Sequence, residues 1–333
     1  MQLDSDLPKK IQPIEHIVLV FCNGIGDAFM ALPALRALRK VFTKKITLIC
    51  CQTHENWWYD ELHFDEVLPF DFDVSNQRIN FEVNYAYKQI KHVDIVISLL
   101  TDKSESLEQL IELWKPKWTA GMFGSHDFVL KCYKDLNMFC ACFELMKLID
   151  SSIVITDFAY PIIIPKPALH TAKLFLNHII RNNTKILCIH METKPEKMWS
   201  KNSWQQLLNQ VLVTLPNYKI LIIGLKEDSS IDKDDKNIIS FFGFNLALIA
   251  AMLTCADIFI GVDSCMLHLA DLAKIPSIGL FGPTDPKRFG CYFTNGRNIH
   301  SANKMMDMKV ADVLQELALL SDSFQRKNYE TTY

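Results

Sequence analysis

One stretch near the C-terminus limits the possible folds of this chain more than any other. An apolar segment, Ala256–Gly261, stops just before the pair Asp263-Ser264, and a helical pattern follows as far as Leu272. A second apolar segment then ends in the turn 282–286 (GPTDP). A strand, a helix and a second strand at this spacing are typical of a parallel sheet covered by helices.

The residues that follow the first of these strands predict an anion site. Asp263 is a natural N-cap for the helix. The backbone N–H groups of Ser264, Cys265 and Met266 would then be unpaired in the first helical turn. The helix dipole favours negative charge at that end, and phosphate is the anion that best fits it. We therefore expect a phosphate site that needs no glycine-rich loop.

The same alternation of strands and helices runs through two halves of the chain. Strands are expected at Glu15–Phe21, Ile46–Cys50, Glu66–Leu68, Val93–Ser98, Lys185–His190, Lys219–Ile223, Ile258–Gly261 and Ser277–Phe281. Helices are expected at Ala28–Val41, Ser104–Leu113, Trp204–Leu215, Asn245–Thr254 and Leu267–Ala273. The pattern predicts an α/β protein with two doubly wound, Rossmann-like domains, whose parallel sheets face each other across a cleft. The prolines at 161, 165 and 167 suggest an N-terminal domain of residues 1–165 and a C-terminal domain of residues 166–333.

Composition and charge exclude several classes of protein. The chain of 333 residues is 49% hydrophobic and 22% charged, which is ordinary for a globular protein. Its net charge is −3 and its basic residues are scattered, so no nucleic-acid partner is expected. The first residues lack the basic and apolar regions of a signal peptide, and no segment is apolar over about eighteen residues. We expect a cytoplasmic protein.

The ten cysteines do not form a metal-binding or disulfide pattern. They lie mostly in apolar runs, and no C-x-x-C pair occurs. Buried free thiols are the better interpretation, and no metal ligand is expected among them.

A second motif follows the first expected strand. Residues 21–38 read FCNGIGDAFMALPALRAL, in which Gly24 and Gly26 look like the opening of a dinucleotide fingerprint. The third glycine of that fingerprint should stand where this chain has Phe29, so an NAD site is disfavoured. A flexible loop remains, with Asp27 beside the first turn of a long helix. Asp27 is either a helix cap or a functional carboxylate.

Together these motifs resemble one known family. Gly26-Asp27 with residues 32–38 (LPALRAL), the pattern 263–270 (DSCMLHLA) and residues 281–286 (FGPTDP) resemble glycosyltransferase family 9, the heptosyltransferases. The resemblance covers about residues 15 to 320. It implies the GT-B fold and transfer from ADP-heptose without a metal or other cofactor. The family builds the lipopolysaccharide inner core of Gram-negative bacteria.

A third segment is similar to the family signature Lys-x-Trp-Pro-x-x-x-Trp. Lys197, Trp199 and Trp204 match it, and Ser200 stands where the family usually has proline. The resemblance places Lys197 at the donor phosphates, with Thr193 near them. A lysine just beyond a carboxyl-edge strand can offset the charge of a departing diphosphate.

The resemblance also assigns further donor-site residues. Glu227 is expected to contact the ribose of the nucleoside, with the adjacent Asp228 as the alternative. His268 is either a hydrogen-bond donor to the phosphates or a packed core histidine. Cys265 stands where the family commonly has glycine, and a thiol at a helix N-terminus could have a lowered pKa and be reactive.

The implied reaction is an inverting transfer. A carboxylate takes the proton of an acceptor hydroxyl while the donor domain stabilises the departing nucleoside diphosphate. By resemblance Asp27, in an acceptor-side loop with Gly24 and Gly26, is that base. The donor would be ADP-heptose or a similar nucleotide sugar. The acceptor would be a glycan or glycolipid, such as the lipopolysaccharide core, at the inner face of the cytoplasmic membrane, where the protein could attach peripherally.

Three alternatives compete with this interpretation. The same fold also serves nucleotide-sugar enzymes that are not transferases, such as epimerases. A binding protein derived from a decayed transferase is the second alternative, because Cys265 departs from the family. Finally, Asp71-Phe72-Asp73 spells the D-x-D of metal-dependent glycosyltransferases, but it lies away from the donor motifs and we interpret it as surface acids.

Overall fold

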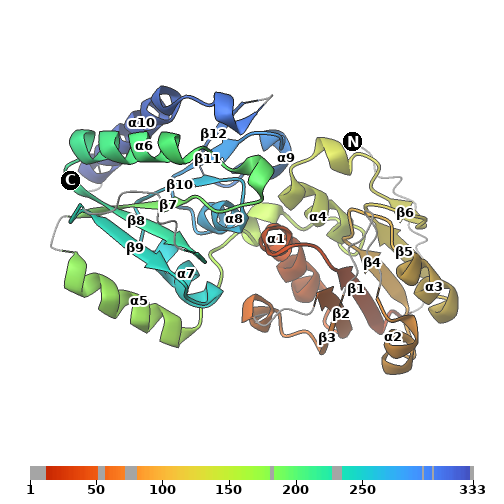
Figure 1. Cartoon of the computed structure of the whole chain (residues 1–333). Helices are drawn as coiled ribbons and strands as arrows, with labels where there is room; N and C mark the ends of the chain where they lie inside the picture. The colour runs from red at the N-terminus through yellow and green to blue at the C-terminus, as the bar shows by residue number, and fades with distance from the viewer. Residues whose placement is uncertain are drawn as a thin grey trace. The chain divides into compact units, whose positions relative to one another are not determined.

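The protein consists of two compact units (Figure 1). The computed structural model describes residues 13–51, 57–71, 81–180, 184–226, 235–294, 296–301 and 304–330, with the side chains of the last helix described as far as residue 321. Contacts divide the chain into Met1–Ala159 and Tyr160–Tyr333. The division falls ahead of the prolines at which the sequence suggested a boundary. Within the described residues, no helix is long and apolar enough to cross a membrane.

The N-terminal unit contains a six-stranded sheet of order β3-β2-β1-β4-β5-β6. All its neighbouring strands pair in parallel. The strands are β1 (His16–Phe21), β2 (Lys45–Cys51), β3 (Glu66–Phe70), β4 (Ile95–Ser98), β5 (Trp118–Gly121) and β6 (Phe128–Val129). The helices are α1 (Ile25–Val41), α2 (Val83–Gln89), α3 (Glu105–Trp114) and α4 (Met138–Met146), with short 3₁₀ turns η1 (Trp57–Leu62), η3 (Tyr133–Asp135) and η4 (Ile155–Asp157).

The C-terminal unit repeats this design with the order β12-β11-β10-β7-β8-β9. Its strands, also parallel, are β7 (Lys185–His190), β8 (Tyr218–Gly224), β9 (Ile238–Phe242), β10 (Ile258–Val262), β11 (Ser277–Phe281) and β12 (Arg297–His300). Its helices are α5 (Lys166–Ile179), α6 (Lys201–Thr214), α7 (Leu246–Leu253), α8 (Cys265–Leu272), α9 (Pro286–Phe289) and α10 (Val310–Glu330), with 3₁₀ turns η5 (Pro195–Lys197) and η6 (Met305–Asp307).

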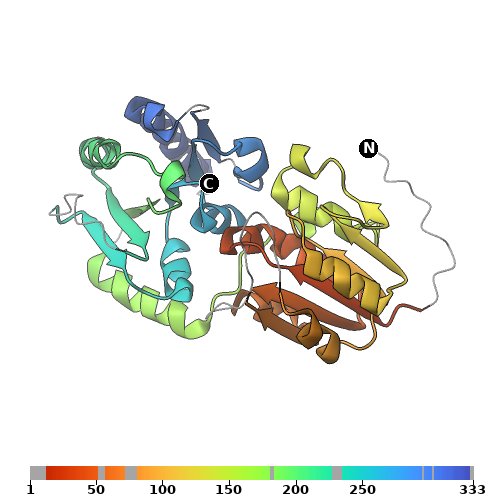
Figure 2. The ribbon, with the colours of Figure 1, turned by 45° about the vertical axis from the view of Figure 1, so that its right-hand side comes forward.

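Helices cover both faces of each sheet. In the N-terminal unit α1 packs beside α4, and α2 packs beside α3. In the C-terminal unit α6 and α10 lie on one face of the sheet and α5 and α7 on the other, as the turned view in Figure 2 also shows. Because both faces are covered, the central strands are continuous apolar runs without polar alternation. The predicted fold class, two doubly wound α/β domains, is confirmed.

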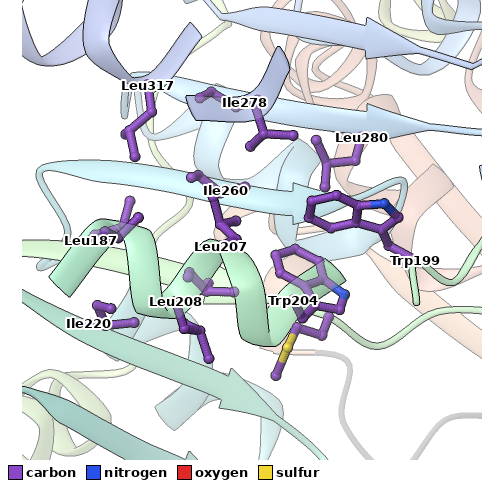
Figure 3. Close-up of a cluster of buried hydrophobic side chains, with 14 of the residues drawn as sticks. Leu187, Trp199, Trp204, Leu207, Leu208, Ile220, Ile260, Ile278, Leu280 and Leu317 are labelled. Carbon is purple, nitrogen blue, oxygen red and sulfur yellow. The ribbon is translucent and has the colours of Figure 1, made fainter. Parts of the chain in front are cut away.

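The tryptophans of the third motif are core residues of the C-terminal unit. Trp199 and Trp204 are each 2% exposed, and their ring centroids lie 5.0 Å apart in an edge-to-face arrangement. Figure 3 shows both rings among the side chains of β10, β11 and α6. Trp199 Nε1 also donates a hydrogen bond to the Met308 carbonyl, at 3.1 Å. These contacts fix the end of the loop that carries Lys197.

An aspartate holds the equivalent strand junction in each unit. Asp94, just before β4, accepts hydrogen bonds from the N–H groups of Glu15 and His16 at the start of β1, at 2.8 and 3.0 Å. Asp257, just before β10, accepts one from Ile186 in β7, at 2.7 Å. Burial alone would raise the pKa of Asp94, but these N–H groups and the Lys117 ammonium outweigh it and lower the pKa to about 2. The carboxylates thus bind the middle pair of strands at the amino edge of each sheet.

Candidate functional site

Three neighbouring strands of the C-terminal sheet deliver polar residues to one edge. β10, β7 and β8 are adjacent and parallel, so their carboxyl ends meet at the same edge. They end at Val262, His190 and Gly224. Ligands of open α/β sheets bind at this edge. The motif residues around 193–197 and 263–268 are therefore brought together as the sequence predicts.

An ion pair joins the first two of these loops. Lys197 Nζ lies 2.6 Å from Asp263 Oδ2, and the two side chains are 22% and 5% exposed. The hydroxyl of Thr193 donates a hydrogen bond to the backbone carbonyl of Asp263, at 2.9 Å. Lys197 is the last residue of the short turn η5, which the buried Trp199 anchors. The lysine ammonium is thus held next to the start of α8.

The prediction that Asp263 caps α8 is wrong. The N-cap is Ser264, in an extended conformation, and its hydroxyl lies 3.0 Å from His190 Nδ1 instead of capping the helix. The Asp263 carboxylate instead faces Lys197, because a charge-assisted bond to an ammonium is stronger than a cap bond to a neutral amide. The N–H groups of Cys265 and Met266 still lie in the first turn of α8, at the positive end of the helix.

Two buried histidines lie behind this edge. His190 is 7% exposed, and burial lowers its pKa to about 4. His268 is 3% exposed, and burial lowers its pKa against the opposing effect of Asp263 and Asp271. His268 Nε2 is 3.9 Å from Asp263 Oδ1. Its burial favours the packed-core alternative for His268, and His190 was not identified from the sequence.

The prediction of a reactive Cys265 thiol is also wrong. Burial raises the pKa of this thiol to about 11, and the nearby Glu192 carboxylate adds to the rise. Burial of the thiolate charge thus outweighs the favourable effect of the helix N-terminus. All ten cysteines are free, as expected, but only Cys22, Cys50, Cys142 and Cys188 are fully buried, and the other six are partly exposed.

Glu192 is a further site residue that the sequence did not reveal. Its carboxylate accepts hydrogen bonds from the backbone N–H groups of Leu225 and Lys226, both at 2.7 Å. It occupies the space beside Gly224, where an added Cβ would lie 2.9 Å from the carboxyl carbon. A glutamate in a charged loop gives no sequence signal of such contacts. Glu227 and Asp228, the expected ribose ligands, lie outside the described residues.

The N-terminal motif forms the junction between β1 and α1. The helix begins at Ile25, so Gly26 and Asp27 lie in its first turn and the prediction of a loop through them is wrong. Gly24 is the N-cap, and Asp27 Oδ2 accepts a hydrogen bond from its N–H, at 3.2 Å. Asn23 Nδ2 donates to the carbonyl of Leu99, at 3.0 Å, which ties this junction to the end of β4. The half-buried Asp27 carboxylate thus stabilises the start of α1.

The described residues also bear on metal binding. Among them, no group of three or more His, Cys, Asp or Glu side chains is arranged to hold a metal ion. Asp71 of the D-x-D sequence is exposed, and Asp73 lies outside the described part of the chain.

Solved structures with this architecture show which fold the chain has. A glycosyl transferase of family 9 from Veillonella parvula superposes with a TM-score of 0.73 at 18% identity, over 92% of this chain and 97% of that one. E. coli heptosyltransferase WaaC with ADP gives a TM-score of 0.64 at 16% identity, over 92% and 99%. E. coli ADP-heptose lipopolysaccharide heptosyltransferase II gives 0.64 at 14%, over 94% and 99%. The chain has the GT-B fold of the heptosyltransferases.

A family model matches the part of the chain that holds the C-terminal motifs. Residues 165–318 match glycosyltransferase family 9 (heptosyltransferase), which confirms the predicted resemblance over this part of the chain. The matched residues include Lys197, Asp263 and the whole of α8. No curated protein matches the sequence.

Proposed function

We propose that this protein is an inverting glycosyltransferase. It moves a heptose or a related sugar from ADP-heptose, or a similar nucleotide sugar, to a hydroxyl of the lipopolysaccharide core or of another glycan. The observation that carries the proposal is the Lys197–Asp263 pair at the N-terminus of α8. Similar structures hold ADP and ADP-2-deoxy-2-fluoro heptose, which supports a nucleotide-sugar donor.

The donor diphosphate binds at the carboxyl edge of the C-terminal sheet. The N–H groups of the first turn of α8 and the Lys197 ammonium meet its negative charge. Asp263 orients Lys197 from the opposite side. When the sugar leaves, the diphosphate gains charge and the lysine interaction strengthens, which lowers the barrier.

Asp27 is the general base of the transfer. As the acceptor oxygen attacks the anomeric carbon, its proton passes to the Asp27 carboxylate. The bond from the anomeric carbon to the diphosphate breaks, and its electron pair leaves with the diphosphate. Attack opposite the leaving group inverts the configuration of the sugar.

The other parts of the proposal concern the acceptor and metal ions. We assign the acceptor to the N-terminal unit, and a glycan or glycolipid at the inner face of the cytoplasmic membrane fits a cytoplasmic transferase.

Because Lys197 and the helix N–H groups meet the diphosphate charge, the reaction needs no metal ion. Chelator treatment should leave turnover intact, whereas a Mg²⁺ requirement abolished by Asp71→Asn or Asp73→Asn would contradict this.

The experiment combines binding with turnover. ADP binding is measured by calorimetry, and ADP release is followed with ADP-heptose and lipopolysaccharide truncated in the inner core. Lys197→Met should weaken ADP binding at least about tenfold. Lys194→Met is the matched control, since Lys194 is exposed in the same loop and should not matter. The proposal would be overturned if the wild-type protein neither binds ADP nor forms ADP from ADP-heptose in the presence of the acceptor.

A further inference from the structure

The loop after β8 is held by a single side chain from the loop after β7. The two oxygens of Glu192 each take one backbone N–H, that of Leu225 or that of Lys226, at 2.7 Å. The carboxyl group fills the space that Gly224 leaves open. Two adjacent N–H groups and a glycine form an anion-binding site of the kind found at phosphates, and in this protein a side chain of the chain itself occupies it.

This contact lies within the edge assigned to the donor. Glu192 is the second residue after β7 and lies between the β8 loop and the first turn of α8, where its charge affects Cys265. Because the two N–H groups are already satisfied, this part of the edge does not offer them to a phosphate. Both side chains of the segment are exposed, the apolar one of Leu225 (63%) and the basic one of Lys226. The Leu225 side chain can pack against the base of a nucleoside, and the satisfied N–H groups leave no backbone donors here for a diphosphate.

We propose that Glu192 is a positioning residue, which holds residues 224–226 in the shape that receives the nucleoside of the donor. The inference rests on the proposed function. Lys197 and α8 bind the diphosphate, and Glu192 braces the neighbouring loop. Loss of the brace should therefore weaken binding of a nucleotide but not binding of the diphosphate alone.

The test compares ADP with inorganic pyrophosphate. In Glu192→Gln one amide oxygen can accept one N–H, but the amide NH₂ cannot accept the other. The dissociation constant for ADP, measured by calorimetry, should rise about tenfold, while that for pyrophosphate stays within about twofold. In turnover, KM for the nucleotide sugar should rise and kcat should stay within about twofold.

A second variant disrupts the contact between Glu192 and the β8 loop by a change in the loop itself. In Gly224→Ala the methyl group would lie 2.9 Å from the Glu192 carboxyl and displace it. It should reproduce the loss selective for ADP. In the double variant Glu192→Gln/Gly224→Ala the loss should be less than the product of the single losses, because both remove one contact. Asp257→Asn is the control, since it alters a carboxylate bond to backbone at the opposite end of β7 and should leave ADP binding unchanged.

Three results would overturn the inference. Equal losses for ADP and pyrophosphate would show that Glu192 supports the whole site. Tighter binding of both by Glu192→Gln would show that its charge acts on the phosphates. Unchanged ADP binding in both single variants would show that the loop does not receive the nucleoside. Wild-type protein that binds no ADP would instead contradict the proposed function.

Discussion

Lys197 and Asp263 form a 2.6 Å ion pair although 66 positions separate them in the chain. The pair connects the loop after β7 with the loop after β10, the two central strands of the C-terminal sheet. The aspartate is nearly buried and the lysine is partly exposed. The carboxylate therefore fixes the position of the lysine side chain at this edge of the sheet.

Loss of Lys197 and loss of Asp263 should lower the stability of the protein by different amounts. Lys197→Met leaves the buried Asp263 carboxylate without its cation and should lower the free energy of unfolding by about 2 kcal/mol. Asp263→Asn leaves a partly exposed lysine, which water can solvate, and should lower it less. Urea denaturation of both variants checks this. Equal losses would show that the ion pair is not what stabilises this junction.

Asp27→Asn should nearly abolish transfer. Loss of a general base reduces the rate by about two to four orders of magnitude. The asparagine oxygen can still accept the Gly24 N–H, so α1 and ADP binding should be unaffected. Glu82→Gln is the control, because Glu82 caps α2 in a comparable way. Turnover above roughly a tenth of the wild-type value in Asp27→Asn would rule out the base assignment.

If the nucleotide binds at the start of α8 as proposed, labelling of Cys265 should report its presence. Its pKa of about 11, against an ordinary 9.0, leaves about a hundredfold less thiolate at neutral pH, so alkylation should be slow and should accelerate as the pH rises toward 11. Saturating ADP should protect the thiol, as followed by mass spectrometry of the Cys265 peptide. Cys265→Gly should retain ADP binding, and Cys265→Phe should block it. Equal labelling with and without ADP, and normal binding by Cys265→Phe, would place the diphosphate elsewhere.

His190 should make the protein less stable in mild acid. Its pKa is about 4 in the folded protein and 6.5 ordinarily, so the unfolded chain binds more protons between these values. The stability that His190 contributes above pH 6.5 is lost as the pH falls, by about 2 kcal/mol at pH 5. His190→Asn should show a correspondingly smaller loss between pH 7.5 and pH 5 in urea denaturation. An identical pH dependence in both proteins would show that His190 protonates freely in the fold.

The sequence predicts eight of the twelve described strands. All eight expected strands are present, because buried parallel strands are apolar runs that end at turn residues. β5, β9, β6 and β12 were not predicted. Of these, β6 has only two residues and β12 reads RNIH, so neither carries an apolar pattern. Both strands lie at sheet edges, where pairing with a single neighbour suffices to form them.

The residues of the candidate site could be predicted only where they belong to a recognisable sequence motif. Lys197, Thr193 and Asp263 converge as their motifs indicate, yet the partner of Asp263 was misassigned, because a local cap and a distant ion pair use the same carboxylate. Glu192 and His190 act through groups on other strands, namely the amides of Leu225 and Lys226 and the hydroxyl of Ser264. Such pairings depend on how strand ends align, which a single sequence does not specify.

The equal strand order of the two sheets, with an aspartate at the same junction of each, makes the protein modular. Each unit has its own hydrophobic core. Lys197, Asp263, Glu192 and the first turn of α8 all lie in the unit that begins at Tyr160. Under the proposed function, recognition of the nucleotide and recognition of the acceptor could therefore change independently during evolution, with one half retained while the other adapts to a new glycan.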